Sequence, residues 1–93
     1  MDRVRISLQA ADDLEDISLY IGKDSPFYAK EVIKNILQSI KVLEKFPKIG
    51  RMVPERQNPN IREIIYRGYR IIYQISGEIV EIITVIHGSK RLT

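Results

Sequence analysis

The chain has 93 residues, 44% of them hydrophobic and 29% charged, which is enough apolar material for one core and too much for a disordered chain. Cysteine is absent and histidine occurs once, which excludes a disulfide framework and a thiolate metal site. Residues 1–44 hold six Lys/Arg against eight Asp/Glu, whereas residues 45–93 hold nine against four. The basic C-terminal half favours an acidic protein or a nucleic acid as partner, with plain solvated surface charge as the alternative.

We expect one domain over residues 1–93, with no metal and no cofactor. No apolar run approaches the roughly 20 residues that a membrane-spanning helix needs. Residues 1–5 also lack the apolar core of a signal peptide, so the sequence predicts a cytoplasmic protein with no membrane partner.

The N-terminal half predicts a strand followed by two helices. Residues 3–8 alternate between apolar and polar side chains, which is typical of a half-buried strand near the edge of a sheet. Apolar residues then recur at helical spacing from Ala10 until Gly22. Ser25 and Pro26 predict the N-cap and first residue of a second, longer helix, which Phe46-Pro47 closes.

The C-terminal half predicts a loop and three antiparallel strands. Residues 48–60 contain a glycine and two prolines and show neither helical nor strand periodicity. The strands follow within residues 61–87, separated by tight turns at Arg67-Gly68 and Gly77-Glu78. The fold class is therefore α+β in the order β-α-α-β-β-β, with a helical hairpin packed on one face of a mainly antiparallel sheet.

A turn at Gly77-Glu78 fixes the register of the last two strands. The predicted pairs are Ile75 with Val80, Tyr73 with Ile82, Ile71 with Thr84, and Tyr69 with Ile86. This apolar face must lie under the helices. Tyr66, Tyr69 and Tyr73 fall on it, so we expect core tyrosines with hydrogen-bonded hydroxyls rather than stacking platforms for bases.

The opposite, mixed face holds the candidate catalytic residues. In the predicted register Arg70 faces Val85, and His87 lies diagonally beside Arg70. An arginine fork and a histidine that titrates near neutrality suit metal-free RNA cleavage, with Glu55 as a possible base. Lys48 and Arg51 in the loop add phosphate donors. The alternative is structural: Arg70 pairs with Glu63, and His87 is a solvated strand end.

Five aliphatic residues of the mixed face form a second candidate site. They are Ile61, Ile65, Ile72, Ile83 and Val85. A patch of this size is typical of a partner surface, such as one for a peptide that folds on binding. The alternative is that the loop of residues 48–60 or the C-terminal tail covers it.

Several short motifs, in order and spacing, resemble the RelE/ParE toxin superfamily over almost the whole chain. They are Ala11-Asp12-Asp13-Leu14-Glu15-Asp16-Ile17, Ser25-Pro26-Phe27-Tyr28-Ala29, Phe46-Pro47 with Gly50-Arg51, Val53-Pro54-Glu55, Asn60-Ile61-Arg62-Glu63, Tyr69-Arg70-Ile71-Ile72-Tyr73 and Val85-Ile86-His87-Gly88. No single motif decides the assignment.

The resemblance implies the toxin of a type II toxin-antitoxin pair, in a hetero-oligomer with an antitoxin whose disordered segment folds around it. Members resembling RelE cut mRNA on the ribosome without metal, and members resembling ParE poison DNA gyrase. Arg70 matches the sheet arginine of the ribonucleases, and His87 lies near their terminal acid/base position. No tyrosine follows His87 and the lysine cluster is missing, so the ending favours the ParE branch. Lys90 and Arg91 would then contact the target together with Lys48 and Arg51.

Overall fold

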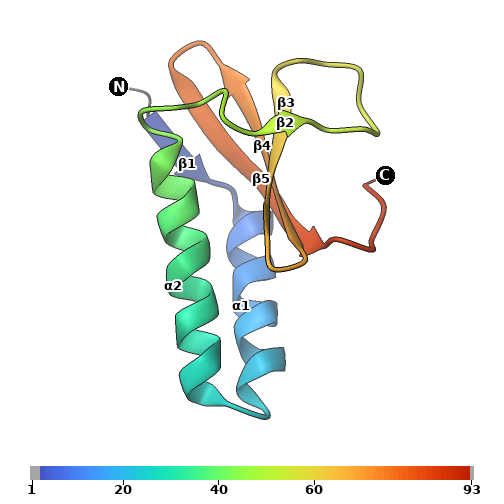
Figure 1. Ribbon diagram of the computed structural model, residues 1–93. Helices are drawn as coiled ribbons and strands as arrows, with labels where there is room; N and C mark the ends of the chain where they lie inside the picture. The colour runs from blue at the N-terminus through green and yellow to red at the C-terminus, as the bar shows by residue number, and fades with distance from the viewer. Residues whose placement is uncertain (1–2, 93) are drawn as a thin grey trace.

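The computed structural model describes residues 3–92, and its sheet has five strands in the order β1-β5-β4-β3-β2, with both helices on one face (Figure 1). The elements are β1 (Arg3–Ile6), α1 (Leu8–Gly22), α2 (Pro26–Val42), β2 (Arg51–Met52), β3 (Ile61–Tyr66), β4 (Tyr69–Ser76) and β5 (Ile79–His87). Strand β1 runs parallel to β5, and the other neighbours are antiparallel. The predicted α+β class is confirmed, with β1 at the sheet edge as expected.

Serine caps set the start of both helices. Helix α2 begins as predicted, because the Ser25 side chain accepts a hydrogen bond from the Tyr28 amide and Pro26 follows it. Ser7 caps α1 in the same way through the Ala10 amide, which lies 3.1 Å from the serine oxygen. The prediction of a strand through Leu8 is therefore wrong: Leu8 is the first helical residue and is 87% exposed.

The segment between α2 and β3 also departs from the prediction. Helix α2 ends at Val42, earlier than Phe46-Pro47, and the expected loop contains the two-residue strand β2. Gly50 allows this because it has no Cβ, so its backbone can approach closely enough for its amide to donate to the Tyr73 hydroxyl at 2.9 Å. An added Cβ at Gly50 would lie 2.6 Å from the Glu63 carbonyl oxygen, so a larger residue would push β2 away from β3.

Both predicted two-residue turns are confirmed, but the register of β4 and β5 holds only near the second one. Ile75 pairs with Val80 and Tyr73 with Ile82, as expected. Farther from this turn, a bulge between the Tyr73–Ile82 and Ile72–Thr84 pairs leaves Ile83 without a partner on β4. The pairs from there to the other end of the two strands are shifted by one position. The predicted partners Thr84 and Ile86 are wrong for Ile71 and Tyr69, which pair with Val85 and His87.

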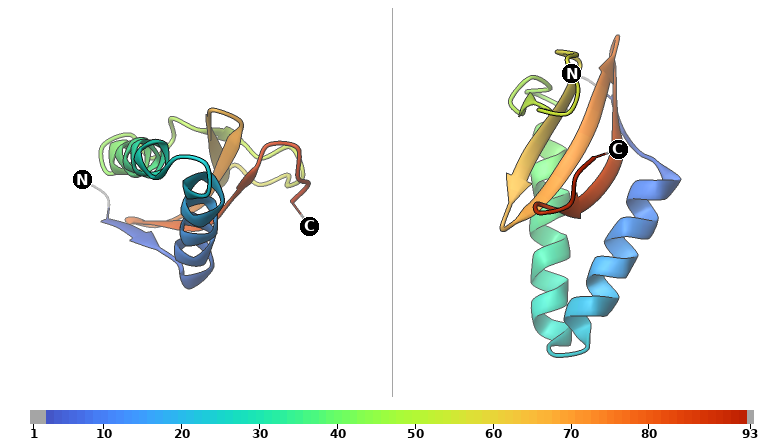
Figure 2. Two further views of the ribbon diagram at one scale, coloured as in Figure 1. Left: turned by 90° about the horizontal axis from the view of Figure 1, so that it is seen from below. Right: turned by 90° about the vertical axis from the view of Figure 1, so that its right-hand side faces the viewer.

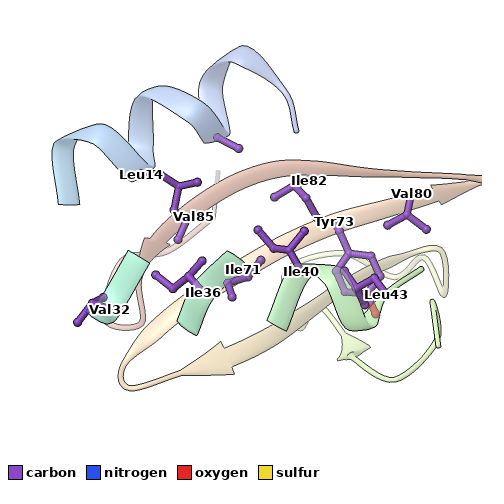
Figure 3. Close-up of a cluster of buried hydrophobic side chains, with 11 residues drawn as sticks. Leu14, Val32, Ile36, Ile40, Leu43, Ile71, Tyr73, Val80, Ile82 and Val85 are labelled. Atoms are coloured by element: carbon purple, nitrogen blue, oxygen red, sulfur yellow. The ribbon is translucent and has the colours of Figure 1, made fainter. Parts of the chain in front are cut away.

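The core lies between the helices and the sheet (Figure 3). Its fully buried residues include Ile36 of α2, Ile71 and Tyr73 of β4, and Ile82 of β5. The predicted helix-covered face is therefore confirmed for β4 and for Val80 and Ile82, whereas beyond the bulge Val85 takes the core position predicted for Thr84. Tyr66 packs partly against this core, and its hydroxyl accepts a hydrogen bond from the Asn35 side-chain amide at 2.9 Å.

Asp13 on α1 bonds to β5 where β1 no longer covers its edge. One carboxylate oxygen accepts hydrogen bonds from the Val85 amide, at 3.0 Å, and from the Thr84 hydroxyl. Thr84 and Val85 are 8% and 2% exposed, so water would satisfy these donors poorly. Asp13 thus fixes α1 against the bulged half of β5.

We expect Asp13→Ala to lower the free energy of unfolding by about 1–3 kcal/mol, because two buried donors lose their acceptor. The matched control Asp12→Ala removes an exposed carboxylate from the same turn and should change it by less than about 0.5 kcal/mol. Urea denaturation measures both. Equal midpoints for the two variants would contradict a role for Asp13 in joining α1 to β5.

Candidate functional site

Arg70 of β4 stands at the centre of a cluster of charged side chains on the sheet face away from the helices. Its Nε donates to Glu63 Oε1 at 2.7 Å, while Nη1 and Nη2 donate to the two oxygens of Glu55 at 2.8 and 2.7 Å. Nη1 also donates to the Lys90 carbonyl at 3.1 Å. Arg51 of β2 extends the cluster, because its Nε lies 2.6 Å from Glu63 Oε2.

These charges are buried, which makes the pairing necessary. Arg70 is 6% exposed and Glu63 is 1% exposed. An isolated charge at such a position is unstable, but two carboxylates and a carbonyl satisfy four of the five guanidinium N–H groups. Within residues 3–92 no buried side-chain nitrogen or oxygen lacks a hydrogen-bond partner. The structural alternative, in which Arg70 pairs with Glu63, describes this arrangement.

The pairing also changes the ionisation of its members. The hydrogen bonds from the Arg70 guanidinium, followed by one from the Leu92 amide, hold the pKa of Glu55 well below its usual range. The Glu55 carboxylate in turn raises the pKa of Arg70. The folded state lowers the pKa of Glu55. The ionised Glu55 carboxylate therefore stabilises the fold at any pH above the usual carboxyl pKa, and this stabilisation is lost as the pH falls below that pKa.

The C-terminal segment, residues 88–92, folds back onto this cluster. The Leu92 amide donates to Glu55 Oε2 at 2.9 Å, and the Gly88 amide donates to the Gly68 carbonyl. Figure 2 shows the segment on the side of the sheet away from the helices. Glu55 lies in the 53–60 loop, so the Arg70 cluster joins the sheet, this loop and the C-terminal segment.

His87 does not join the cluster, contrary to the predicted register. The bulge places Ile86 opposite Arg70 and His87 opposite Tyr69. The His87 ring meets the Tyr69 ring edge-on, with centroids 5.8 Å apart, and its Nδ1 contacts the Ser89 hydroxyl. Successive residues of a strand point to opposite faces, so Arg70 and His87 lie on different faces of the sheet. A single ligand therefore cannot bind between Arg70 and His87 in the way that the predicted register had suggested.

The predicted aliphatic patch is only partly at the surface. Val85 is 2% exposed and belongs to the core under the helices, because the bulge turns it to that face. Ile72 is fully buried on the opposite face, where the 53–60 loop and the C-terminal segment close over the sheet. Ile61 and Ile83 are half-buried, and Ile65 is 51% exposed. The alternative, in which the loop or the C-terminal tail covers the patch, therefore fits Ile72, whereas Val85 lies under the helices and Ile65 stays exposed.

Two of the four predicted target-binding cations flank a cleft of about 450 Å³, which we call the sheet cleft. Its lining residues come from the 50–56 region, the sheet and the C-terminal segment: Arg51, Pro54, Glu55, Ile65, Arg70, Gly88 and Arg91. Lys48 and Lys90 are exposed but are not part of this lining. The structure therefore brings Arg51, Arg91, Glu55 and Arg70 together and leaves the two lysines apart.

A larger groove of about 900 Å³ runs between α1 and α2, and the sequence interpretation did not single it out. Leu19, Phe27 and Leu37 line it and are 62%, 75% and 41% exposed. The sequence could have indicated this groove, because both helices carry apolar residues outside the stripe that faces the core. Such residues have no partner within a two-layer fold.

The described residues offer no arrangement for metal binding or membrane crossing. Within residues 3–92, no three His, Asp or Glu side chains are placed to hold a metal ion together. In the same range, neither helix is both long enough and apolar enough to span a bilayer.

Comparisons with known proteins agree with the resemblance predicted from the sequence. A family model described as ParE toxin of type II toxin-antitoxin system, parDE, matches residues 4–92. A protein of Sinorhizobium fredii (strain NBRC 101917 / NGR234) named "Putative toxin Y4kP" is 36% identical over 91 residues, covering 96% of this chain and 91% of that protein.

Two solved structures share the fold. The chromosomal ParDE TA system from P. aeruginosa matches with a TM-score of 0.77 at 21% identity, covering 94% of this chain and 96% of that chain. The toxin-antitoxin complex RelBE2 from Mycobacterium tuberculosis matches with a TM-score of 0.57 at 20% identity, covering 92% and 96%. The match to the family model and the Sinorhizobium relative carry the assignment further than the fold: this chain belongs to the family of ParE toxins of type II toxin-antitoxin systems.

Proposed function

We propose that this chain arrests growth by inhibiting DNA gyrase, and that an antitoxin neutralises it. The family match supports a toxin. The Arg70 guanidinium is already bound by Glu55 and Glu63. This observation is our reason for proposing a protein target rather than RNA cleavage.

A metal-free ribonuclease needs cationic donors at the scissile phosphate and an acid or base beside them. Arg70 would have to give up two carboxylates before it could bind a phosphate, and Glu55 would have to give up Arg70 before it could take a proton. Its lowered pKa also makes Glu55 a weak base. His87 lies on the other face, against Tyr69. These contacts favour the gyrase proposal over the alternative of a ribosome-dependent mRNA endoribonuclease.

Purified toxin should inhibit supercoiling by gyrase and leave ribosome-bound mRNA intact. His87→Ala should inhibit gyrase as well as the wild-type chain, because the imidazole is exposed and lies against the Tyr69 ring and Ser89, outside the Arg70 cluster. A supercoiling assay and a ribosome-programmed cleavage assay, run on both proteins, measure this. Cleavage of mRNA by the wild-type chain that disappears in His87→Ala would overturn the proposal.

We further propose that the antitoxin lies in the groove between α1 and α2. With Ile72 and Val85 buried, the sheet patch is too small to be its main anchor site. The groove exposes larger apolar side chains. Its charged lining has a net excess of one positive charge, from three lysines and two glutamates: Lys30, Lys34, Lys41, Glu15 and Glu31. Exposed apolar residues flanked by lysines suit an acidic, amphipathic segment that folds on binding. Ile61, Ile65 and Ile83 remain candidates for a second contact along its path.

Leu19→Asp combined with Leu37→Asp should weaken the antitoxin complex by about 100-fold or more, because two aliphatic contacts are lost. Leu8→Asp is the matched control, since Leu8 is also an exposed leucine of α1 but lies outside the groove. Isothermal titration calorimetry with the antitoxin compares the three proteins. Unchanged affinity in the double variant would place the antitoxin on another surface.

A further inference from the structure

We propose that the sheet cleft binds a carboxylate side chain, flanked by an aliphatic one, on the protein that the toxin inhibits. This inference rests on the proposed function, in that the target is a protein. The carboxylate would enter the cleft between Pro54-Glu55 of the 53–60 loop and the C-terminal segment, where Ile65 of β3 is exposed in the lining.

The charges in and beneath the cleft are nearly balanced. Three arginines, Arg51, Arg70 and Arg91, line it, and two carboxylates oppose them: Glu55 in its wall and Glu63, which bridges Arg51 and Arg70. One positive charge is left over. Arg91 carries it, because Arg91 is exposed and no carboxylate of residues 3–92 forms an ion pair with it.

One uncompensated arginine beside an apolar surface fits a single carboxylate. A guanidinium binds a carboxylate through two parallel hydrogen bonds, and an aliphatic neighbour of that carboxylate would bury Ile65 and Pro54. A nucleic-acid track instead needs several unpaired cations, since binding depends on neutralising successive phosphates. The cleft therefore favours an acidic protein segment over RNA or DNA.

The wall that carries Arg91 is held in place before any partner arrives. The Lys90 carbonyl accepts from Arg70 of β4, and the Leu92 amide donates to Glu55, so one neighbour of Arg91 is bonded to the sheet and the other to the 53–60 loop. An added Cβ at Gly88 would lie 2.8 Å from the Gly68 carbonyl oxygen, which shows how closely the segment approaches the β3–β4 turn. A preformed wall lowers the ordering cost of binding. Glu55 and Arg70 thus act as positioning residues for Arg91.

A direct test uses the blocked dipeptide N-acetyl-leucyl-glutamyl amide as probe and the ¹⁵N-labelled toxin as receptor. We expect saturable shifts of the Ile65, Gly88 and Arg91 amides in the wild-type chain. The same amides should not move in Arg91→Glu, nor when the probe carries glutamine instead of glutamate. Lys45→Glu is the matched control, because Lys45 is an exposed cation outside the cleft, and it should respond like the wild-type chain.

Three outcomes would overturn the inference: no shifts at these amides, equal shifts with the glutamine probe, or shifts produced by a short single-stranded oligonucleotide at lower concentration than by the dipeptide. The last outcome would assign the cleft to nucleic acid. Arg91 is exposed, so Arg91→Glu should keep its fold, and circular dichroism checks this.

The supercoiling assay separates this inference from the proposed function. Arg91→Glu should need about tenfold more protein, or beyond, for half-inhibition of gyrase, while Lys45→Glu stays unchanged. If the wild-type chain does not inhibit gyrase but its amides still shift with the dipeptide, the gyrase proposal fails and the carboxylate site stands. If gyrase is inhibited and Arg91→Glu inhibits equally, the cleft is not the contact.

Discussion

The burial of Arg70 is the constraint on which one half of this structure depends. A guanidinium that is 6% exposed must find acceptors inside the protein, and it finds Glu63 on the neighbouring strand and Glu55 on the 53–60 loop. Glu55 then binds the Leu92 amide, so the loop and the C-terminal segment close over the same face. A residue that looks catalytic in the sequence thus organises the surface around it, and Arg91 is held at the edge of that surface.

The other half depends on hydrophobic packing under the two helices. The bulge at Ile83 lets β5 turn Val85 into this core while Thr84 meets Asp13 of α1. The same shift carries His87 to the Tyr69 side, away from Arg70. One inserted residue therefore separates two side chains that a regular hairpin would have placed together. This separation, together with the paired state of Arg70, favours recognition of a protein over cleavage of RNA.

The sequence predicted the fold well because its strongest signals are periodic or local. The alternation in β4, the Ser25-Pro26 helix start and the Gly77 turn each have one dominant physical cause. The sites were predicted less well because a bulge leaves no reliable mark in apolar alternation: the run from Ile82 to Val85 reads equally well in two registers. The pairing of Arg70 with Glu63 was visible as an alternative. Its second partner, Glu55, depends on how a loop folds back, which no local pattern encodes.

The central claim is that Arg70 serves structure rather than chemistry, and a double-mutant cycle on Glu55 and Arg70 tests it most directly. Free energies of unfolding would be measured at neutral pH for the wild-type chain, Glu55→Gln, Arg70→Met and the double variant. The exposed Arg5–Glu81 pair, with 3.4 Å between its atoms, is the reference and should couple by about 0.2–1 kcal/mol. We expect Glu55 and Arg70 to couple clearly more strongly than this pair. A coupling no larger than that of the reference, with Arg70→Met as stable as the wild-type chain, would contradict the account.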